Sequence, residues 1–123
     1  MLADRLDRID LELAALERTA GAQLEPAIAL IGQTMRAWLE HEGRAEPPSN
    51  ADVLEVWKAL VKGDPTWNAI RDNCRELVYY RNCLALGRAD ALPAQPHRMA
   101  VRTARHIYLY VRSRAVREGL VPG

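Results

Sequence analysis

Apolar side chains recur at helical spacing along almost the whole 123-residue chain, and this pattern restricts the fold more than any other feature. The first segment places its apolar residues alternately four and three positions apart, with charged residues between them: Leu2, Leu6, Ile9, Leu13 and Leu16. Such a stripe occupies one narrow face of a helix and needs a partner helix to cover it. Phenylalanine is absent and β-branched runs are scarce, so we predict no strand.

Glycine and proline divide this pattern into segments. Gly21 and Pro26 predict a break or kink before a second helix that ends near Glu42. The segment GRAEPPSN then predicts a loop, because its two prolines cannot continue a helix. A short helix over residues 51–62 follows, for which Asn50 is the expected N-cap.

Two longer helices are expected in the C-terminal half. Asp64 and Pro65 are a helix-start pair, and the helix they open should run to about Leu86, where Gly87 terminates it. After the loop GRADALPAQP, a last helix is expected over residues 97–118.

These segments predict an all-α fold, an antiparallel bundle of four to five helices in which residues 1–123 form a single domain. No apolar run approaches the roughly 20 residues that span a bilayer, and the first residues lack an apolar signal segment. We therefore expect a cytoplasmic protein without membrane contact. Cys74 and Cys83 are too few for a disulfide framework, and no histidine stands at ligand spacing from them. No metal and no cofactor are expected.

Charge is distributed unevenly along the chain. Residues 1–50 carry nine acidic and five basic side chains, a net charge of −4, whereas residues 51–123 carry seven acidic and twelve basic, a net charge of +5. Four arginines share one face of the last predicted helix: Arg98, Arg102, Arg105 and Arg112. Such a stripe can follow a nucleic-acid backbone, and the tyrosines Tyr79, Tyr80, Tyr108 and Tyr110 could stack on unpaired bases. Equally, the arginines can pair with the acidic first helix, at Asp4, Asp7, Asp10, Glu12 and Glu17.

One arginine interrupts the apolar face of the helix predicted over residues 64–86. That face contains Trp67, Ile70, Cys74, Leu77 and Leu84, and Arg81 falls between the last two at 100° per residue. Burying an unpaired guanidinium costs several kcal/mol. Arg81 must therefore meet a carboxylate, reach solvent at the helix end, or line a site for an anion.

The segment LVYYRNCLALGR around this arginine resembles the signature of the HEPN families, in which an Arg-Asn pair is followed by an apolar pair, a histidine and a glycine. The matching positions here are Arg81-Asn82, Leu84-Ala85, Leu86 in place of the histidine, and Gly87-Arg88. The resemblance implies a helical bundle that pairs as a dimer or with a partner such as an antitoxin. Many HEPN proteins are metal-independent ribonucleases of toxin–antitoxin, antiviral or RNA-processing systems, so RNA is the implied ligand.

The resemblance also implies roles for single residues. Arg81 would hold the scissile phosphate with two hydrogen bonds, Asn82 would orient the reacting groups, and Arg88 would grip the RNA backbone. Leu86 cannot accept or donate a proton, and general acid–base catalysis typically contributes about 10²- to 10⁴-fold in rate. A ribonuclease with this residue is expected to be impaired, whether the substitution is natural or engineered. Neither His97 nor His106 is assigned the missing role.

Three functional hypotheses follow. The first is a HEPN-like, RNA-associated protein related to endoribonucleases and impaired at Leu86. The second is a non-catalytic helical subunit of a nucleoprotein or defence complex that binds nucleic acid and partner helices. The third is an adaptor without nucleic acid, in which the acidic first helix and the basic last helix simply pair.

Overall fold

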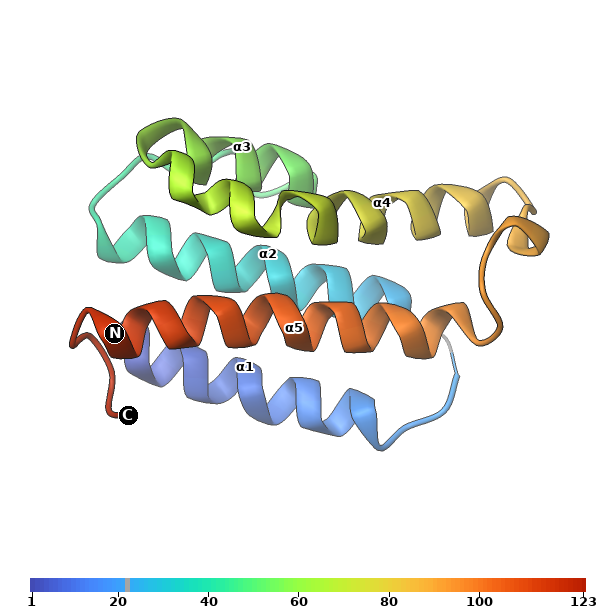
Figure 1. Ribbon diagram of the computed structural model, residues 1–123, viewed down its shortest axis with the longest axis horizontal. Coiled ribbons are helices and arrows are strands. Elements are labelled where there is room, and N and C mark those ends of the chain that lie inside the picture. Colours follow the sequence, from blue (N-terminus) through green and yellow to red (C-terminus); the bar gives the residue numbers. More distant parts are fainter. Residues whose placement is uncertain (22) are drawn as a thin grey trace.

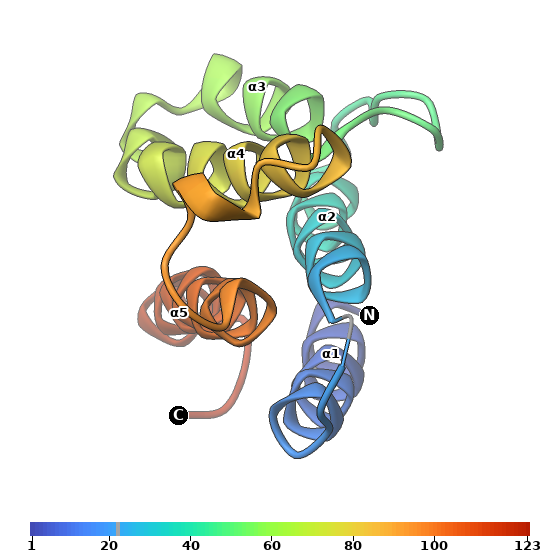
Figure 2. The ribbon, with the colours of Figure 1, turned by 90° about the vertical axis from the view of Figure 1, so that its right-hand side faces the viewer.

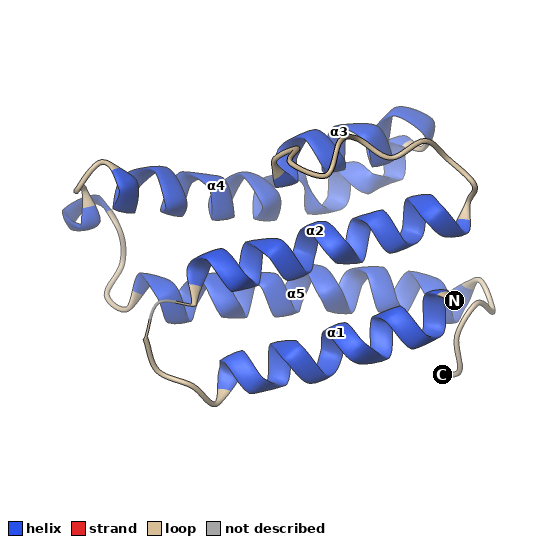
Figure 3. Ribbon diagram, turned by 180° about the vertical axis from the view of Figure 1, so that it is seen from behind, coloured by secondary structure: helices blue, strands red, loops and turns tan. Residues whose placement is uncertain are grey.

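The computed structural model describes residues 1–21 and 23–123, and this part of the chain is built from helices and loops (Figures 1 and 3). The elements, in chain order, are α1 (Leu2–Glu17), α2 (Leu24–His41), α3 (Val53–Gly63), a 3-10 helix (Pro65–Ile70), α4 (Arg71–Ala85), a second 3-10 helix (Ala89–Ala91) and α5 (Pro96–Arg117). No strand occurs in the described ranges and five α-helices do, so the prediction of an all-α chain with four to five helices is confirmed.

The four long helices alternate in direction along the chain (Figure 1). The α1–α2 turn and the α4–α5 connection lie at one end of the bundle, and both chain termini lie at the other. Seen along the bundle, α3 and α4 form one side, and α1 and α5 lie on the opposite side (Figure 2). Helix α2 lies between the α3–α4 side and α1. Consequently α2 and α5, which pack together, begin at the same end and run parallel.

The core follows the predicted apolar stripes. On α1 the buried residues are Leu2, Leu6, Ile9 and Leu13, which face α2 and α5. Elsewhere in the core, Trp38 of α2 packs edge to face against Trp67 of the first 3-10 helix, with ring centroids 5.1 Å apart. The guanidinium of Arg114 on α5 lies 4.3 Å from the Trp67 ring centroid. Cys74 and Cys83, both on α4, are free and buried.

Several element boundaries differ from the prediction. The N-cap of α3 is Asp52, not Asn50, because the Asp52 carboxylate accepts a hydrogen bond of 2.8 Å from the Val53 N–H. Asp64 does start a helical segment, accepting from the Thr66 N–H at 3.0 Å, but this segment is the 3-10 helix that precedes α4. Pro26 lies in the first turn of α2, where its missing N–H is tolerated, so the break precedes Leu24.

The predicted end of α4 at Gly87 is confirmed. Gly87 adopts the left-handed region, with φ of +70°, and the Arg88 N–H donates to the Cys83 carbonyl at 2.7 Å. This is the usual glycine-terminated helix end, in which the reversed chain satisfies a free carbonyl. Within the described residues, no helix is sufficiently long and apolar to cross a membrane.

Candidate functional site

Arg81 projects from the apolar face of α4 and meets a carboxylate. Its two terminal nitrogens each donate to one oxygen of Asp52, both at 2.7 Å. The two side chains are 27% and 36% exposed, so the pair is partly shielded from water. The bond from Arg81 holds the pKa of Asp52 below its usual value, and the Val53 N–H lowers it further, against a rise from burial. Of the three alternatives for Arg81, the structure contains the ion pair.

The surroundings of this pair are acidic overall. A cavity of about 680 Å³ between α2, α3 and the preceding loop contains two arginines and three carboxylates among its lining residues: Glu25, Arg36, Glu46, Asp52 and Arg81. Arg36 is itself engaged, donating to the carbonyls of Pro47 at 2.8 Å and Pro48 at 2.6 Å. A phosphate entering here would meet a net charge of −1 and two guanidiniums that already have acceptors. As it stands, this cavity does not favour an anion.

The other motif residues lie outside this cavity. Asn82 is exposed on α4, and Leu86 is the C-cap of that helix with 77% of its surface exposed. Arg88 is exposed and pairs with Asp90 at 3.2 Å. Of the motif residues, Arg81 alone lines this cavity among the described residues, and no histidine lies in its lining.

The basic face of α5 is divided. Arg105 binds Glu17 with hydrogen bonds of 2.9 and 3.1 Å and Asp10 at 2.5 Å, and Arg112 binds Asp7 at 3.1 Å. For these two arginines the structure contains the pairing with α1 that was one of the two predicted alternatives. These bonds raise the pKa of both guanidiniums against the effect of burial, with Tyr108 the largest contributor at Arg112.

Three of the four tyrosines considered for base stacking are committed to the fold. Tyr108 is buried and its hydroxyl donates to the Leu6 carbonyl at 2.8 Å, so the stacking prediction is wrong for this residue. Tyr80 is buried as well, and Tyr110 packs against Trp67 with ring centroids 5.8 Å apart. Tyr79 is the exposed member of the set.

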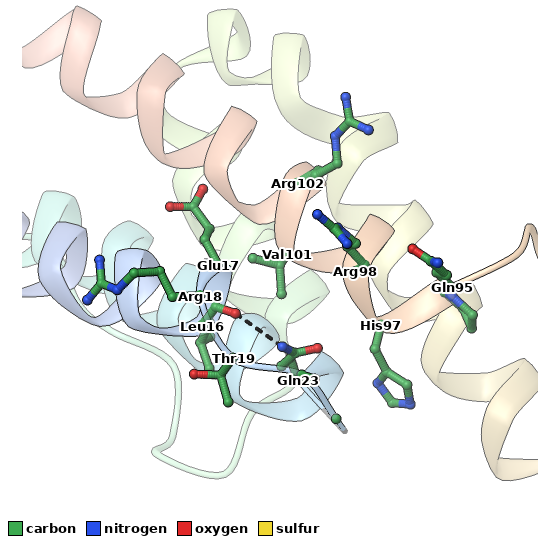
Figure 4. Close-up of a pocket in the computed structure, with 13 residues that line it drawn as sticks. Leu16, Glu17, Arg18, Thr19, Gln23, Gln95, His97, Arg98, Val101 and Arg102 are labelled. Carbon is green, nitrogen blue, oxygen red and sulfur yellow. Dashed lines mark hydrogen bonds between the residues drawn. The ribbon is translucent and has the colours of Figure 1, made fainter.

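Arg98 and Arg102, in the first two turns of α5, differ from the other arginines of that face. Both are exposed, and within residues 1–21 and 23–123 neither has an acidic partner. With Arg18, at the end of α1, they line a second cavity of about 720 Å³ (Figure 4). Its one acidic lining residue is Glu17, whose carboxylate is held by Arg105. We refer to this cavity as the α5 pocket.

Two helix starts meet beside the α5 pocket. The N–H of Leu24, the first residue of α2, donates to Nδ1 of His97 in the first turn of α5 at 3.2 Å. His97 thus acts as a cap for α2, and it lines a different cavity from Arg81. Gln95, the N-cap of α5, has φ of +57° and makes no side-chain cap bond. Because α2 and α5 are parallel, the positive ends of both helix dipoles point to this end of the bundle.

No pattern in the sequence pointed to Arg18, Gln23 or Gln95 as site residues. The loop GRADALPAQP followed by an arginine-rich helix was the available signal for a helix start with free cations. It could not show that α1, α2 and α5 meet there, because that depends on how the helices pack. Among the described residues, no three histidine, cysteine or acidic side chains are grouped as metal ligands would be.

Comparison with protein-family models, with curated proteins and with solved structures finds no match to this chain.

Proposed function

We propose that this protein is a HEPN-like RNA-binding domain that does not cleave RNA and that contacts RNA through the start of α5. The observation that carries the proposal is the division of the α5 arginines. Arg105 and Arg112 are engaged by α1, whereas Arg98 and Arg102 are exposed, have no acidic partner among the described residues, and line one cavity with Arg18. Exposed arginines grouped on one edge suit phosphate contacts, and the resemblance of the Arg81 segment to HEPN proteins supports RNA as the ligand.

Two features support an inactive domain. The guanidinium proposed to clamp the scissile phosphate is occupied by Asp52, so phosphate would have to displace a carboxylate bound through two hydrogen bonds. Leu86, at the histidine position, offers no proton transfer and faces solvent. The proposed RNA-binding surface is then at the start of α5, whereas the motif residues lie on α4 and in the turn that follows it.

The test is binding of a labelled single-stranded RNA, compared between two double variants of equal charge. Arg98→Gln with Arg102→Gln removes the free pair of α5. Arg71→Gln with Arg75→Gln is the matched control, because these arginines are also exposed, also four residues apart on a helix, and line neither cavity. We expect affinity to fall at least about tenfold in the first variant, since two charged hydrogen bonds are lost, and about twofold or less in the second. Equal losses would refute the proposed surface.

Restoring the motif histidine should not restore a nuclease. We expect Leu86→His to leave RNA intact in a prolonged incubation, because Arg81 stays bound to Asp52. The stability of the variant should change by less than about 0.5 kcal/mol, because the side chain is exposed. RNA cleavage by Leu86→His that is abolished by Arg81→Ala would show that the ion pair opens and that the domain is a disabled nuclease.

A second proposal concerns pairing with another copy of the chain. Tyr79 and Leu86 are two helical turns apart on one face of α4, and they are 52% and 77% exposed. The HEPN resemblance implies dimers, and this apolar face is the surface we propose for one. Analytical ultracentrifugation should show a dimer that Leu86→Glu dissociates, whereas an unchanged sedimentation coefficient in the variant would reject this surface.

A further inference from the structure

We propose that the α5 pocket binds the phosphate-bearing terminal nucleotide of an RNA strand, an assignment that rests on the proposed RNA-binding function. The pocket holds the end of a strand rather than a point along it. Its ligand chemistry is a phosphate monoester joined to a sugar and base.

The residues that line the pocket carry a net positive charge, and none of its arginines has an acidic partner among the described residues. Arg18, Arg98 and Arg102 contribute three positive charges, and Glu17 contributes the one negative charge among the lining residues, for a net charge of +2. Glu17 is bound by Arg105, which lies outside the lining, so its carboxylate repels a ligand less than an isolated one would. By contrast, the Arg81 cavity has a net charge of −1.

The start of α5 adds hydrogen-bond donors. The backbone N–H groups of His97 and Arg98 belong to the first turn of the helix, where no intrahelical acceptor exists. Gln95 makes no side-chain cap bond that would satisfy them. Free N–H groups at a helix start bind phosphate oxygens, and the α2 dipole points to the same end of the bundle.

A terminal phosphate suits these charges better than an internal one. A monoester carries roughly −1.5 to −2 charges at neutral pH and has three terminal oxygens, whereas a backbone diester carries one charge. The attraction to a fixed set of cations therefore rises up to about twofold for the monoester. The volume of about 720 Å³ lies within the range of roughly 300 to 1,000 Å³ typical of small-molecule sites, and it can hold a nucleotide.

Gln23 offers the pocket a hydrogen-bond acceptor that the sugar or base of a nucleotide can use. The residue is only 8% exposed, and its side-chain nitrogen donates to the Leu16 carbonyl at 3.1 Å. That bond fixes the amide so that its oxygen points away from Leu16, toward the side of the pocket where His97 and Arg98 lie (Figure 4). Within the described residues, no donor is bonded to this oxygen. This oxygen is open to the pocket and can accept a hydrogen bond from a ribose hydroxyl or a base N–H, donors that a phosphate monoester dianion alone lacks.

The experiment compares one short single-stranded RNA carrying a 5′-phosphate, a 3′-phosphate or hydroxyls at both ends. We expect one phosphorylated form to bind at least about tenfold more tightly than the hydroxyl form, because added charged hydrogen bonds are typically worth this much. Arg98→Gln should remove that preference, and the control Arg75→Gln should keep it. The form that binds more tightly identifies which end of the strand enters.

Uridine monophosphate and inorganic sulfate then test the role of Gln23. Gln23→Leu should weaken binding of the nucleotide by about tenfold and leave binding of sulfate unchanged, since the sulfate dianion carries no hydrogen-bond donor for the lost oxygen. Circular dichroism of the variant verifies its fold. Equal weakening of both probes in a folded variant would overturn the assignment of a nucleotide.

The outcomes separate this inference from the proposed function. If all three RNAs bind equally and Arg98→Gln weakens them equally, the domain binds RNA but the terminal-nucleotide site is refuted. If none of the RNAs binds, the proposed function fails and this inference fails with it.

Discussion

The two ends of α5 contain the same residue type in opposite situations. Near its C-terminal end, Arg114 is only 14% exposed, bonds to Asp64, Thr66 and Glu118, and stacks over Trp67. Near its N-terminal end, Arg98 is exposed with no acidic partner in the described part of the chain. The difference arises from the neighbours that the bundle supplies, because one end faces acidic residues and the other faces a turn. An arginine-rich helix is therefore both part of the fold and a candidate ligand surface, and the two roles are separable by mutation.

The largest expected effect is a loss of folding stability when Arg114, the less exposed of these two arginines, is replaced. Replacing Arg114 with Gln removes three hydrogen-bonded contacts and the stacking over Trp67, and it leaves Asp64 without its cation. We expect the free energy of unfolding to fall by about 2 to 4 kcal/mol. Urea denaturation measures it, with Arg98→Gln as the matched variant on the same helix, for which a change below about 0.5 kcal/mol is expected. If both variants lose a similar amount of unfolding free energy, the two ends of α5 do not differ in their structural role.

A smaller loss is expected at the Arg81–Asp52 pair, which combines an ion pair with a helix cap. Asp52→Asn retains an oxygen for the Val53 N–H but loses the charge facing Arg81. We expect it to lower the unfolding free energy by about 1 kcal/mol, given that the pair is partly exposed. Asp52→Ala loses both roles and should cost about 2 kcal/mol. If the two variants are equally stable in chemical denaturation, the cap contributes nothing.

The smallest expected effect is a loss of folding stability at acidic pH, through protonation of Asp64. Bonds from the Thr66 side chain, from Arg114 and from the Thr66 N–H lower the pKa of Asp64 from 3.8 to about 2. Because the folded-state pKa is the lower one, the associated stability is present above about pH 3.8 and is lost as the pH falls toward 2. Unfolding curves from neutral pH downward should show wild type losing its advantage over Asp64→Asn within this window. An advantage that persists at the acid end would contradict the assignment to Asp64.

The helices could be predicted from the sequence because their signal is local. Spacings of three and four residues locate α1, α2 and α5 to within a few residues, and Gly87 marks the end of α4. The N-cap of α3 was misassigned because Ser49, Asn50 and Asp52 are all suitable cap residues in one short segment. The choice of Asp52 coincides with its bond to Arg81, which lies 29 positions away in the sequence.

The candidate sites were predictable only in part, for the same reason. That Arg81 needed a partner followed from its position in an apolar stripe, but the identity of the partner is a tertiary contact. The pairing of Arg105 and Arg112 with α1 was one of two open alternatives, since charge counts do not give helix orientation. The α5 pocket forms because α2 and α5 run parallel and begin at the same end of the bundle. The spacing of residues in the sequence predicts helices, but it does not predict their relative direction.

The most direct test of the division within α5 is the salt dependence of RNA binding. For single strands, the slope of log affinity against log salt is about −0.7 for each phosphate neutralised. The variant with both Arg98→Gln and Arg102→Gln should therefore have a slope smaller in magnitude by about 1.4 than wild type, with an unchanged midpoint of urea unfolding. The matched variant with Arg71→Gln and Arg75→Gln should keep the wild-type slope. If the Arg98 and Arg102 variant keeps the wild-type slope, the start of α5 is not the RNA-binding surface.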